Sequence, residues 1–279
     1  MYETHFGLQE APFSLTPNTR YFQHSKTHWE ALKLLLVSLQ QREGFIKVSG
    51  EVGTGKTMLC RMLLNGLSKK TVTAYLPNPQ LTPEGLFSAL ADELGLTLPE
   101  ATNTHRTLSL LTQHLIELAG QNKTVVLVID EAQAMPEETL EALRLLTNLE
   151  TESYKLLQVV LFGQPELDEV LNRPSLRQLK QRICFQYRLQ ELDRKGVADY
   201  IHHRLHQAGH NGGQLFSPGA IRLLASASEG TPRLINILAH KSLIAAYGMG
   251  APGVSRRHVR LAVKDTDSAR QGLWSRRPA

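Results

Sequence analysis

The chain has 279 residues, of which 42% are hydrophobic and 20% are charged, and its formal net charge is +5. This composition is typical of an ordinary soluble globular protein. No segment approaches the roughly eighteen uncharged apolar residues that a membrane-crossing helix needs, so the sequence excludes that class and predicts a cytoplasmic protein.

The positive charge is concentrated at the end of the chain. Residues 256–279 hold seven Lys and Arg side chains and two Asp side chains. Their net charge of +5 equals the net charge of the whole chain. Residues 1–255 are therefore formally neutral, and composition demands no broad basic face. We interpret residues 267–279 as a basic, flexible and solvated tail. An acidic partner, phospholipid headgroups and nucleic acid remain alternatives for what it touches.

In chain order, the first strong periodicity predicts a helix over residues 26–41, with four leucines on one face. Five apolar runs then predict strands at residues 45–49, 72–76, 124–129, 157–162 and 183–189. Between them, helices are predicted at residues 54–67, 83–94, 105–119 and 136–149, and Thr82 is the expected N-cap of the second. Strands separated by helices of this length predict right-handed crossovers and a parallel sheet.

After about residue 189 only helical patterns remain, at residues 194–208, 218–228, 233–247 and 256–264. The fold class is therefore α/β, a three-layer core followed by a small all-α domain. The predicted boundaries are 1–44 for an N-terminal linker and helix, 45–189 for the core, 190–266 for a helical lid, and 267–279 for the tail. Cys60 and Cys184 are expected in the interior, as small hydrophobes without a functional role. Trp29 is expected in the core, with a wall of the adenine pocket as the alternative.

Residues 50–57 read G-E-V-G-T-G-K-T, a phosphate loop of the Walker A type directly after an apolar run. The glycines let consecutive N–H groups point inward at phosphates, at the positive end of the following helix. Lys56 is suited to the β- and γ-phosphates, and the Thr57 hydroxyl to Mg²⁺. The predicted nucleotide-binding residues are Gly50, Glu51, Val52, Gly53, Thr54, Gly55, Lys56, Thr57 and Met58.

Two acids, Asp130 and Glu131, follow the apolar run 125–129 in the manner of a Walker B motif. Ligands sit outside the carboxyl ends of parallel strands, so these acids are expected beside the phosphate loop. Asp130 would hold Mg²⁺, and Glu131 would orient and polarise the water that attacks the γ-phosphate. Together with the loop, the pair predicts a Mg²⁺-dependent ATP hydrolase.

Arginines form a third set. Arg173, Arg177 and Arg182 precede the last predicted strand, and Arg233 lies in the G-T-P-R segment of the helical domain. The guanidinium group stays charged and binds phosphate oxygens bidentately, which suits a residue that completes a nucleotide site. Ordinary exposure on a surface helix is the alternative for the first three.

These motifs, with D-E-A-Q at 130–133, F-G-Q-P-E-L at 162–167 and the opening residues F-G-L and P-F, resemble the AAA+ ATPases of the ExeA/GspA general-secretion family. The resemblance implies a five-stranded P-loop core of order 5-1-4-3-2 with a helical lid. It also implies that Arg182 is the leading arginine finger, with Arg177 as runner-up, and that Arg233 is the sensor-2 arginine. The usual Asn, Ser or Thr of sensor 1 is missing, and Gln164 is the nearest polar candidate.

The short relatives in the MSHA type IV pilus branch of this family look most similar. They imply an accessory ATPase that binds ATP and Mg²⁺, forms an ATP-dependent homo-oligomer, and acts on inner-membrane pilus or secretion proteins. Such a protein would be cytoplasmic, or peripheral at the inner membrane through a partner. The alternative is a DNA-associated AAA+ switch, such as a transposition regulator or loader, which the basic segment 255–260 supports. A nucleotide-binding scaffold with an idle Glu131 is a third interpretation.

Overall fold

The computed structural model describes residues 1–23, 26–99, 103–147 and 155–269. The chain divides into two compact units. One unit contains residues 26–52 and 59–189, and the other contains residues 1–25, 53–58 and 190–279.

The first unit is built on a five-stranded sheet of order β2-β3-β4-β1-β5, in which every neighbouring pair is parallel. This is the order that the family resemblance implies, and it is confirmed. All five strands lie within one residue of the predicted bounds at each end, and β1 and β3 match them. The strands are β1 (Phe45–Ser49), β2 (Thr71–Leu76), β3 (Thr124–Ile129), β4 (Leu157–Gly163) and β5 (Ile183–Arg188).

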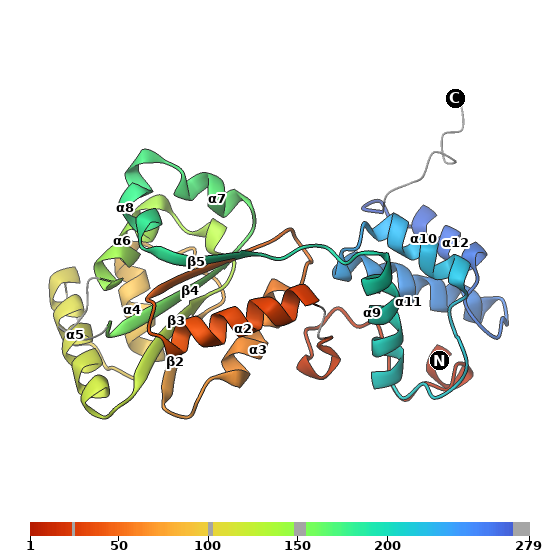
Figure 1. The fold of residues 1–279 in the computed structure, drawn as a ribbon, viewed down its shortest axis with the longest axis horizontal. Helices are drawn as coiled ribbons and strands as arrows, with labels where there is room; N and C mark the ends of the chain where they lie inside the picture. The colour runs from red at the N-terminus through yellow and green to blue at the C-terminus, as the bar shows by residue number, and fades with distance from the viewer. Residues whose placement is uncertain (24–25, 100–102, 148–154, 270–279) are drawn as a thin grey trace. The chain divides into compact units, whose positions relative to one another are not determined.

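Helices cover both faces of the sheet (Figure 1). On one face α2 (Lys26–Gln40) and α3 (Lys56–Gly66) pack their leucines against alternate residues of the strands, such as Ile46 and Val128. The other face is covered by α4 (Pro83–Glu93), α5 (Thr104–Gly120), α6 (Glu137–Thr147), α7 (Glu166–Leu171) and α8 (Arg177–Gln181). The inner strands β1, β3 and β4 are buried on both faces, and this is why the sequence shows continuous apolar runs there.

Helix ends agree with local chemistry. Thr82 caps α4 as expected, since its side chain accepts a hydrogen bond from Gly85 N at 3.1 Å, and Pro83 occupies the first turn. The helix predicted over 136–149 begins at Glu137 and is described to Thr147, because residues 148 and 149 lie outside the described part. Short elements were not predicted: α1 (Tyr2–His5), α7, α8 and the 3₁₀ turns Thr19–Tyr21, Ala132–Ala134 and Pro174–Leu176.

The second unit is helical. Its main helices are α9 (Arg194–Gln207), α10 (Pro218–Ser228), α11 (Pro232–Gly248) and α12 (Arg256–Lys264). They share one core with aromatic residues of the first 25 positions, including Phe13 and Tyr21. Arg204 fixes this N-terminal segment: it is 5% exposed, and its side chain donates to Pro12 O at 2.5 Å and lies over the Tyr21 ring.

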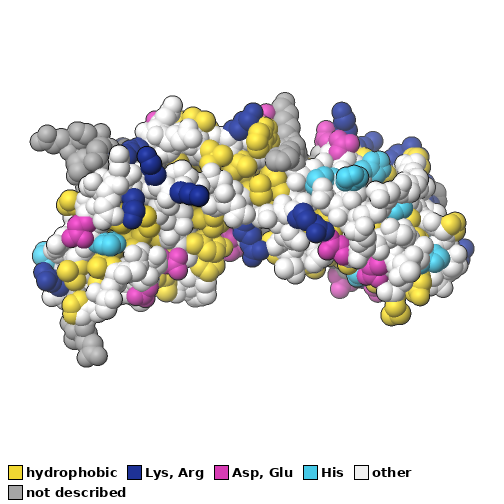
Figure 2. All heavy atoms as spheres, turned by 90° about the horizontal axis from the view of Figure 1, so that it is seen from below, with side chains coloured by type: hydrophobic (Ala, Val, Ile, Leu, Met, Phe, Trp, Pro, Cys, Tyr) yellow, Lys and Arg dark blue, Asp and Glu magenta, His cyan; other side chains and the backbone are white. Residues whose placement is uncertain are grey.

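Surface charge is mixed. Basic and acidic side chains are interspersed on the face drawn in Figure 2, which shows no broad basic area. None of the helices in the described ranges combines the length and the apolar character that a bilayer crossing requires.

Candidate functional site

The phosphate loop joins β1 to α3. Gly53 and Gly55 have φ angles of +82° and +103°, which L side chains rarely adopt, so the curl of the loop depends on glycine at both positions. Successive N–H groups in such a curl form an anion-binding concavity, and α3 begins directly after it at Lys56. At the base of the loop, Gly50 N donates to Gly163 O of β4 at 3.2 Å.

The predicted loop residues differ in exposure. Thr54 and Lys56 are buried, with exposed fractions of 0% and 5%. Thr57 and Met58 are half-buried in the first turn of α3, whereas Glu51 and Val52 are exposed. The exposed Glu51 carboxylate lies 3.6 Å from the Arg188 guanidinium at the end of β5. A lysine beside glycine-shaped backbone fits a phosphate group, because its ammonium group and the successive backbone N–H groups all attract anions.

Asp130 and Glu131 follow β3, as predicted, at the same edge of the sheet at which β1 and β4 end. Asp130 is 3% exposed; its backbone N donates to Leu76 O at 3.0 Å, and its Oδ1 accepts from Glu131 N at 2.9 Å. Glu131 is half-buried, and its φ of +52° places it in the left-handed region. A non-glycine residue in this conformation costs on the order of 1 kcal/mol and is frequent at functional sites.

Two glutamine side chains hold the Glu131 carboxylate. Gln133 Nε2 and Gln164 Nε2 both donate to Glu131 Oε2, at 2.6 and 3.0 Å. The oxygen of the Gln133 amide accepts from Gln164 N at 2.9 Å, which closes the group. Gln164, the residue predicted for sensor 1, therefore lies against Glu131. We name the Gln133 and Gln164 side chains, which hold Glu131, the glutamine clamp.

Gln133 was not among the site residues predicted from the sequence, although it belongs to the D-E-A-Q motif. The available signal was its position two residues after Glu131, in a turn at the end of a buried strand. Gln164 lies 33 residues from Glu131 and reaches it only because β3 and β4 are parallel neighbours.

We expect Gln133→Leu to lower kcat for ATP hydrolysis about tenfold with little change in nucleotide affinity, because a lost hydrogen bond to a charged group is worth about 1.5–3 kcal/mol. Steady-state kinetics and a nucleotide-binding titration would measure the two effects. Gln113→Leu is the matched control, since the Gln113 amide donates a similar hydrogen bond to the Glu117 carboxylate on the exposed side of α5. Equal rates in the two variants would contradict a positioning role for Gln133.

Asp130 also shapes the electrostatics around α3. Burial, together with the smaller effect of the Asp130 charge, raises the pKa of the Cys60 thiol to about 12. Tyr75 contacts Cys60 and has its pKa raised to about 12 by burial, with Cys60 and Asp130 adding to the effect. Cys60 of α3, Tyr75 of β2 and Asp130 after β3 therefore influence one another electrostatically within the core unit.

The expectation of two buried cysteines is only half correct. Cys60 is buried, but Cys184 is exposed, because β5 is an edge strand whose residues alternate between partly covered and exposed positions. Trp29 was also expected in the core, yet it is 40% exposed and lies against Lys33 Nζ, 5.0 Å from the ring centroid.

We expect iodoacetamide at neutral pH to modify Cys184 and spare Cys60 in the native protein, since the thiolate is the nucleophile and burial keeps Cys60 protonated. Peptide mass spectrometry would quantify both sites, with unfolded protein as the control in which both react. Equal modification of the two cysteines in native protein would contradict the burial of Cys60.

The predicted arginines of the core unit lie around α8. Arg177 is the first residue of α8 and is exposed, whereas Arg182 follows its last residue, is half-buried and donates its N–H to Leu179 O at 3.0 Å. Arg173 is paired with Glu137, at 2.6 Å. In the sheet, β5 after α8 is separated from β3 by β4 and β1, so the structure does not group these arginines with Glu131.

Arg233 is the second residue of α11 and is exposed. Within the unit that holds residues 53–58 and 190–279, its N–H donates to Gly53 O at 3.2 Å. A Cβ at Gly53 would lie 2.7 Å from the Arg233 Cβ, so glycine is required there by close approach as well as by its φ angle. The structure thus brings Arg233 to the phosphate loop.

Comparison with known proteins shows what the chain is similar to. Residues 39–171 match the family described as AAA domain. Over 275 residues the chain is 42% identical to general secretion pathway protein A of Aeromonas hydrophila, and the match covers 98% of this chain and 50% of that protein. The chain is homologous to this protein and contains a segment that matches the AAA domain. It spans half the length of that relative.

Solved structures share the fold of this chain. Cdc6p from Pyrobaculum aerophilum matches with a TM-score of 0.71 at 21% identity, covering 91% of this chain and 70% of that one. ORC2 from Aeropyrum pernix matches at 0.67 and 17%, covering 92% and 72%. The RuvB branch migration motor of Thermotoga maritima matches at 0.58 and 17%, covering 86% and 69%. At these identities the likeness supports the AAA fold of the sheet and helices.

Proposed function

We propose that this protein is an ATPase that hydrolyses ATP with Mg²⁺ and uses it to drive or regulate assembly of a type IV pilus of the MSHA kind, as a relative of MshM, or of a related secretion machinery. The observation that carries hydrolysis is the glutamine clamp, which holds the Glu131 carboxylate at the sheet edge from which the phosphate loop starts. The homology to general secretion pathway protein A supports the secretion context.

The residues present fit this substrate. The curled backbone at Gly53 and Gly55 and the buried Lys56 would hold the phosphates, and Thr57 with Asp130 would hold Mg²⁺. When bound, Mg²⁺ neutralises charge on the phosphate oxygens. Glu131 would orient the attacking water and accept its proton, and the two amides would keep the carboxylate in place.

We further propose that the ATPase works as a homo-oligomer. Arg182 is positioned near edge strand β5, three strands from Glu131 in the order of the sheet, so it is better placed to serve a neighbouring subunit than its own site. Arg177 is the second candidate. Arg233 would report the nucleotide state to the helical unit, because its backbone is bonded to Gly53 of the loop. This proposed ATP cycle uses the domain boundaries expected from the sequence, in which residues 190–266 form the lid.

Complementation tests the proposal. Cells that lack the chain would be supplied with the wild type, Glu131→Gln or Glu138→Gln, the last being an exposed glutamate on α6 as control. We expect the wild type and Glu138→Gln to restore surface pili or secretion, and Glu131→Gln to fail. Unchanged pilus and secretion levels in cells without the chain would contradict the proposed role.

A DNA-dependent ATPase is the second candidate function, because Arg256, Arg257 and Arg260 are exposed on α12. The test is the hydrolysis rate with and without duplex DNA at low and moderate salt. Stimulation that falls steeply as salt rises would favour this candidate over the first, since phosphate contacts release counterions.

A further inference from the structure

Five exposed cations gather on two packed helices of the second unit. Arg256, Arg257, Arg260 and Lys264 lie on α12, and Arg222 lies on α10. Within the described residues, none of the five has an ion-pair partner. We name these five residues the basic ridge.

Helical geometry places these side chains together. Arg256, Arg260 and Lys264 follow one another at intervals of four residues, which gives a row about 12 Å long on one side of α12. A Cβ at Gly219 of α10 would lie 3.8 Å from the Arg256 Cβ, and Arg222 is one turn further along α10. The other side of α12, with Val259 and Ala262, is buried in the core of the unit.

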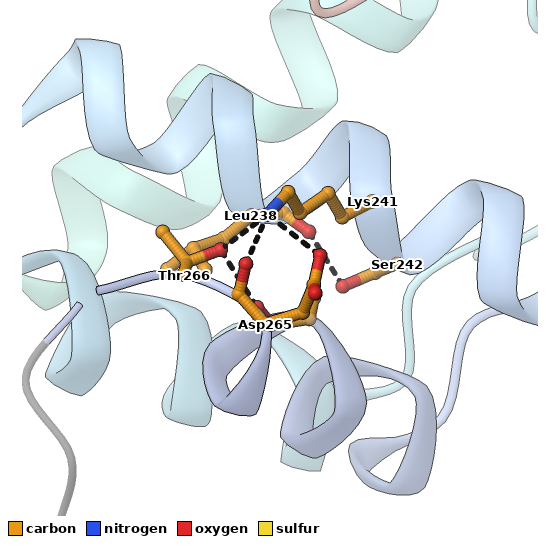
Figure 3. A network of polar contacts seen from close by, with 6 residues as sticks. Leu238, Lys241, Ser242, Asp265 and Thr266 are labelled. Atoms are coloured by element: carbon orange, nitrogen blue, oxygen red, sulfur yellow. Dashed lines mark hydrogen bonds and ion pairs between the residues drawn. The ribbon is translucent and has the colours of Figure 1, made fainter. Parts of the chain in front are cut away.

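Both ends of α12 are fixed. At the start, Ser255 and His258 form a capping box. At the end, Lys241 of α11 donates to Asp265 Oδ2 at 2.8 Å and to Thr266 Oγ1 at 3.0 Å, while Thr266 Oγ1 donates to Ala262 O at 2.8 Å (Figure 3). Asp265 directly follows Lys264 in the sequence, but its carboxylate pairs with Lys241 and not with a residue of the basic ridge.

We propose that the basic ridge is a docking surface for an anionic lipid bilayer, with the phosphate groups of the lipid headgroups as its partner. A cluster of four to eight Lys and Arg on a helix is suited to such a surface, to which each cation contributes attraction. The negative charge that complements these five cations would come from the partner, because no acidic side chain among the described residues forms an ion pair with them.

One residue favours a bilayer over a nucleic acid. Leu261 is 41% exposed and lies on the same side of α12 as Arg257 and Lys264, four residues after the first and three before the second. An apolar side chain among cations matches the boundary between headgroups and acyl chains. A phosphodiester backbone offers it no apolar partner.

Vesicle binding tests the proposal on the full chain. We expect binding to vesicles of phosphatidylglycerol and phosphatidylcholine that weakens as salt rises, and little binding to phosphatidylcholine alone. Arg257→Ala/Arg260→Ala/Lys264→Ala should reduce the affinity for anionic vesicles on the order of a hundredfold. Leu261→Ser should reduce it a few-fold.

The matched control is Lys69→Ala/Lys70→Ala/Lys123→Ala, which removes the same charge from exposed positions of the core unit and should bind like the wild type. Basal ATP hydrolysis should be the same in the wild type and both triple variants, so the result does not depend on the role proposed for Glu131. Equal binding to neutral vesicles, equal loss in both triple variants, or tighter binding to duplex DNA than to anionic vesicles at the same salt would overturn the proposal.

Discussion

Glu131→Gln is expected to bind ATP with nearly unchanged affinity and to hydrolyse it about a hundredfold to a thousandfold more slowly, because loss of a general base typically costs that much. The substitution keeps the size of the side chain and removes its charge. It leaves the loop, Lys56 and Asp130 as they are. Binding of a fluorescent ATP analogue and the rate of phosphate release would separate the two effects.

The structure supplies an internal reason for a large effect. Both amides of the glutamine clamp donate to Glu131 Oε2, so the local hydrogen bonds are arranged for a carboxylate. A glutamine at 131 would present either an oxygen that accepts more weakly or an NH₂ group facing two other donors. Glu138→Gln, at an exposed position of α6, is the control, and a Glu131→Gln rate equal to it would contradict the role of Glu131 as the base.

Arg182→Ala is expected to lower hydrolysis on the order of a thousandfold in the assembled protein, since an arginine that completes a phosphate site from outside contributes this much or more. Binding of ATP by the isolated subunit should change little. The reason is geometric: Arg182 follows α8 beside edge strand β5, whereas the acids follow β3. Phosphate release by the variant and by Arg177→Ala would rank the two candidates.

Mixing two inactive variants tests whether Arg182 acts between subunits. Arg182→Ala retains Glu131, and Glu131→Gln retains Arg182, so an interface that combines them holds one complete site. An equal mixture should recover roughly a quarter of the wild-type rate if the subunits assemble at random through head-to-tail interfaces. A mixture no faster than its components would show that Arg182 serves only its own subunit.

Much of the fold was predictable because its signals are local or continuous. Parallel strands buried on both faces, such as β3 and β4, appear as unbroken apolar runs, and all five strands were found close to their observed bounds. Thr82 and Pro83 identified the start of α4 by chemistry within a few residues. In contrast, α7 and α8, of six and five residues, are too short for a hydrophobic period to be seen.

Exposure was less predictable than secondary structure. Cys184 and Trp29 are of residue types that usually lie in protein interiors, yet both are exposed. Which strand lies at an edge, and which side of a helix faces the sheet, depends on neighbours distant in the sequence. The sequence around Cys184 contains no sign that β5 would pair with a strand on one side only.

The phosphate loop is the part that the amino-acid sequence determined by itself. Eight consecutive residues hold the glycines that permit positive φ angles, the lysine and the threonine, and a helix starts among them, so no distant contact is needed. Only the tertiary structure decided what surrounds this chemistry. Gln133 and Gln164 meet at Glu131 because parallel pairing of β3 and β4 aligns their carboxyl ends, and the basic ridge is exposed because α12 buries its opposite side. Such contacts join residues far apart in the chain, and local propensity carries no information about them.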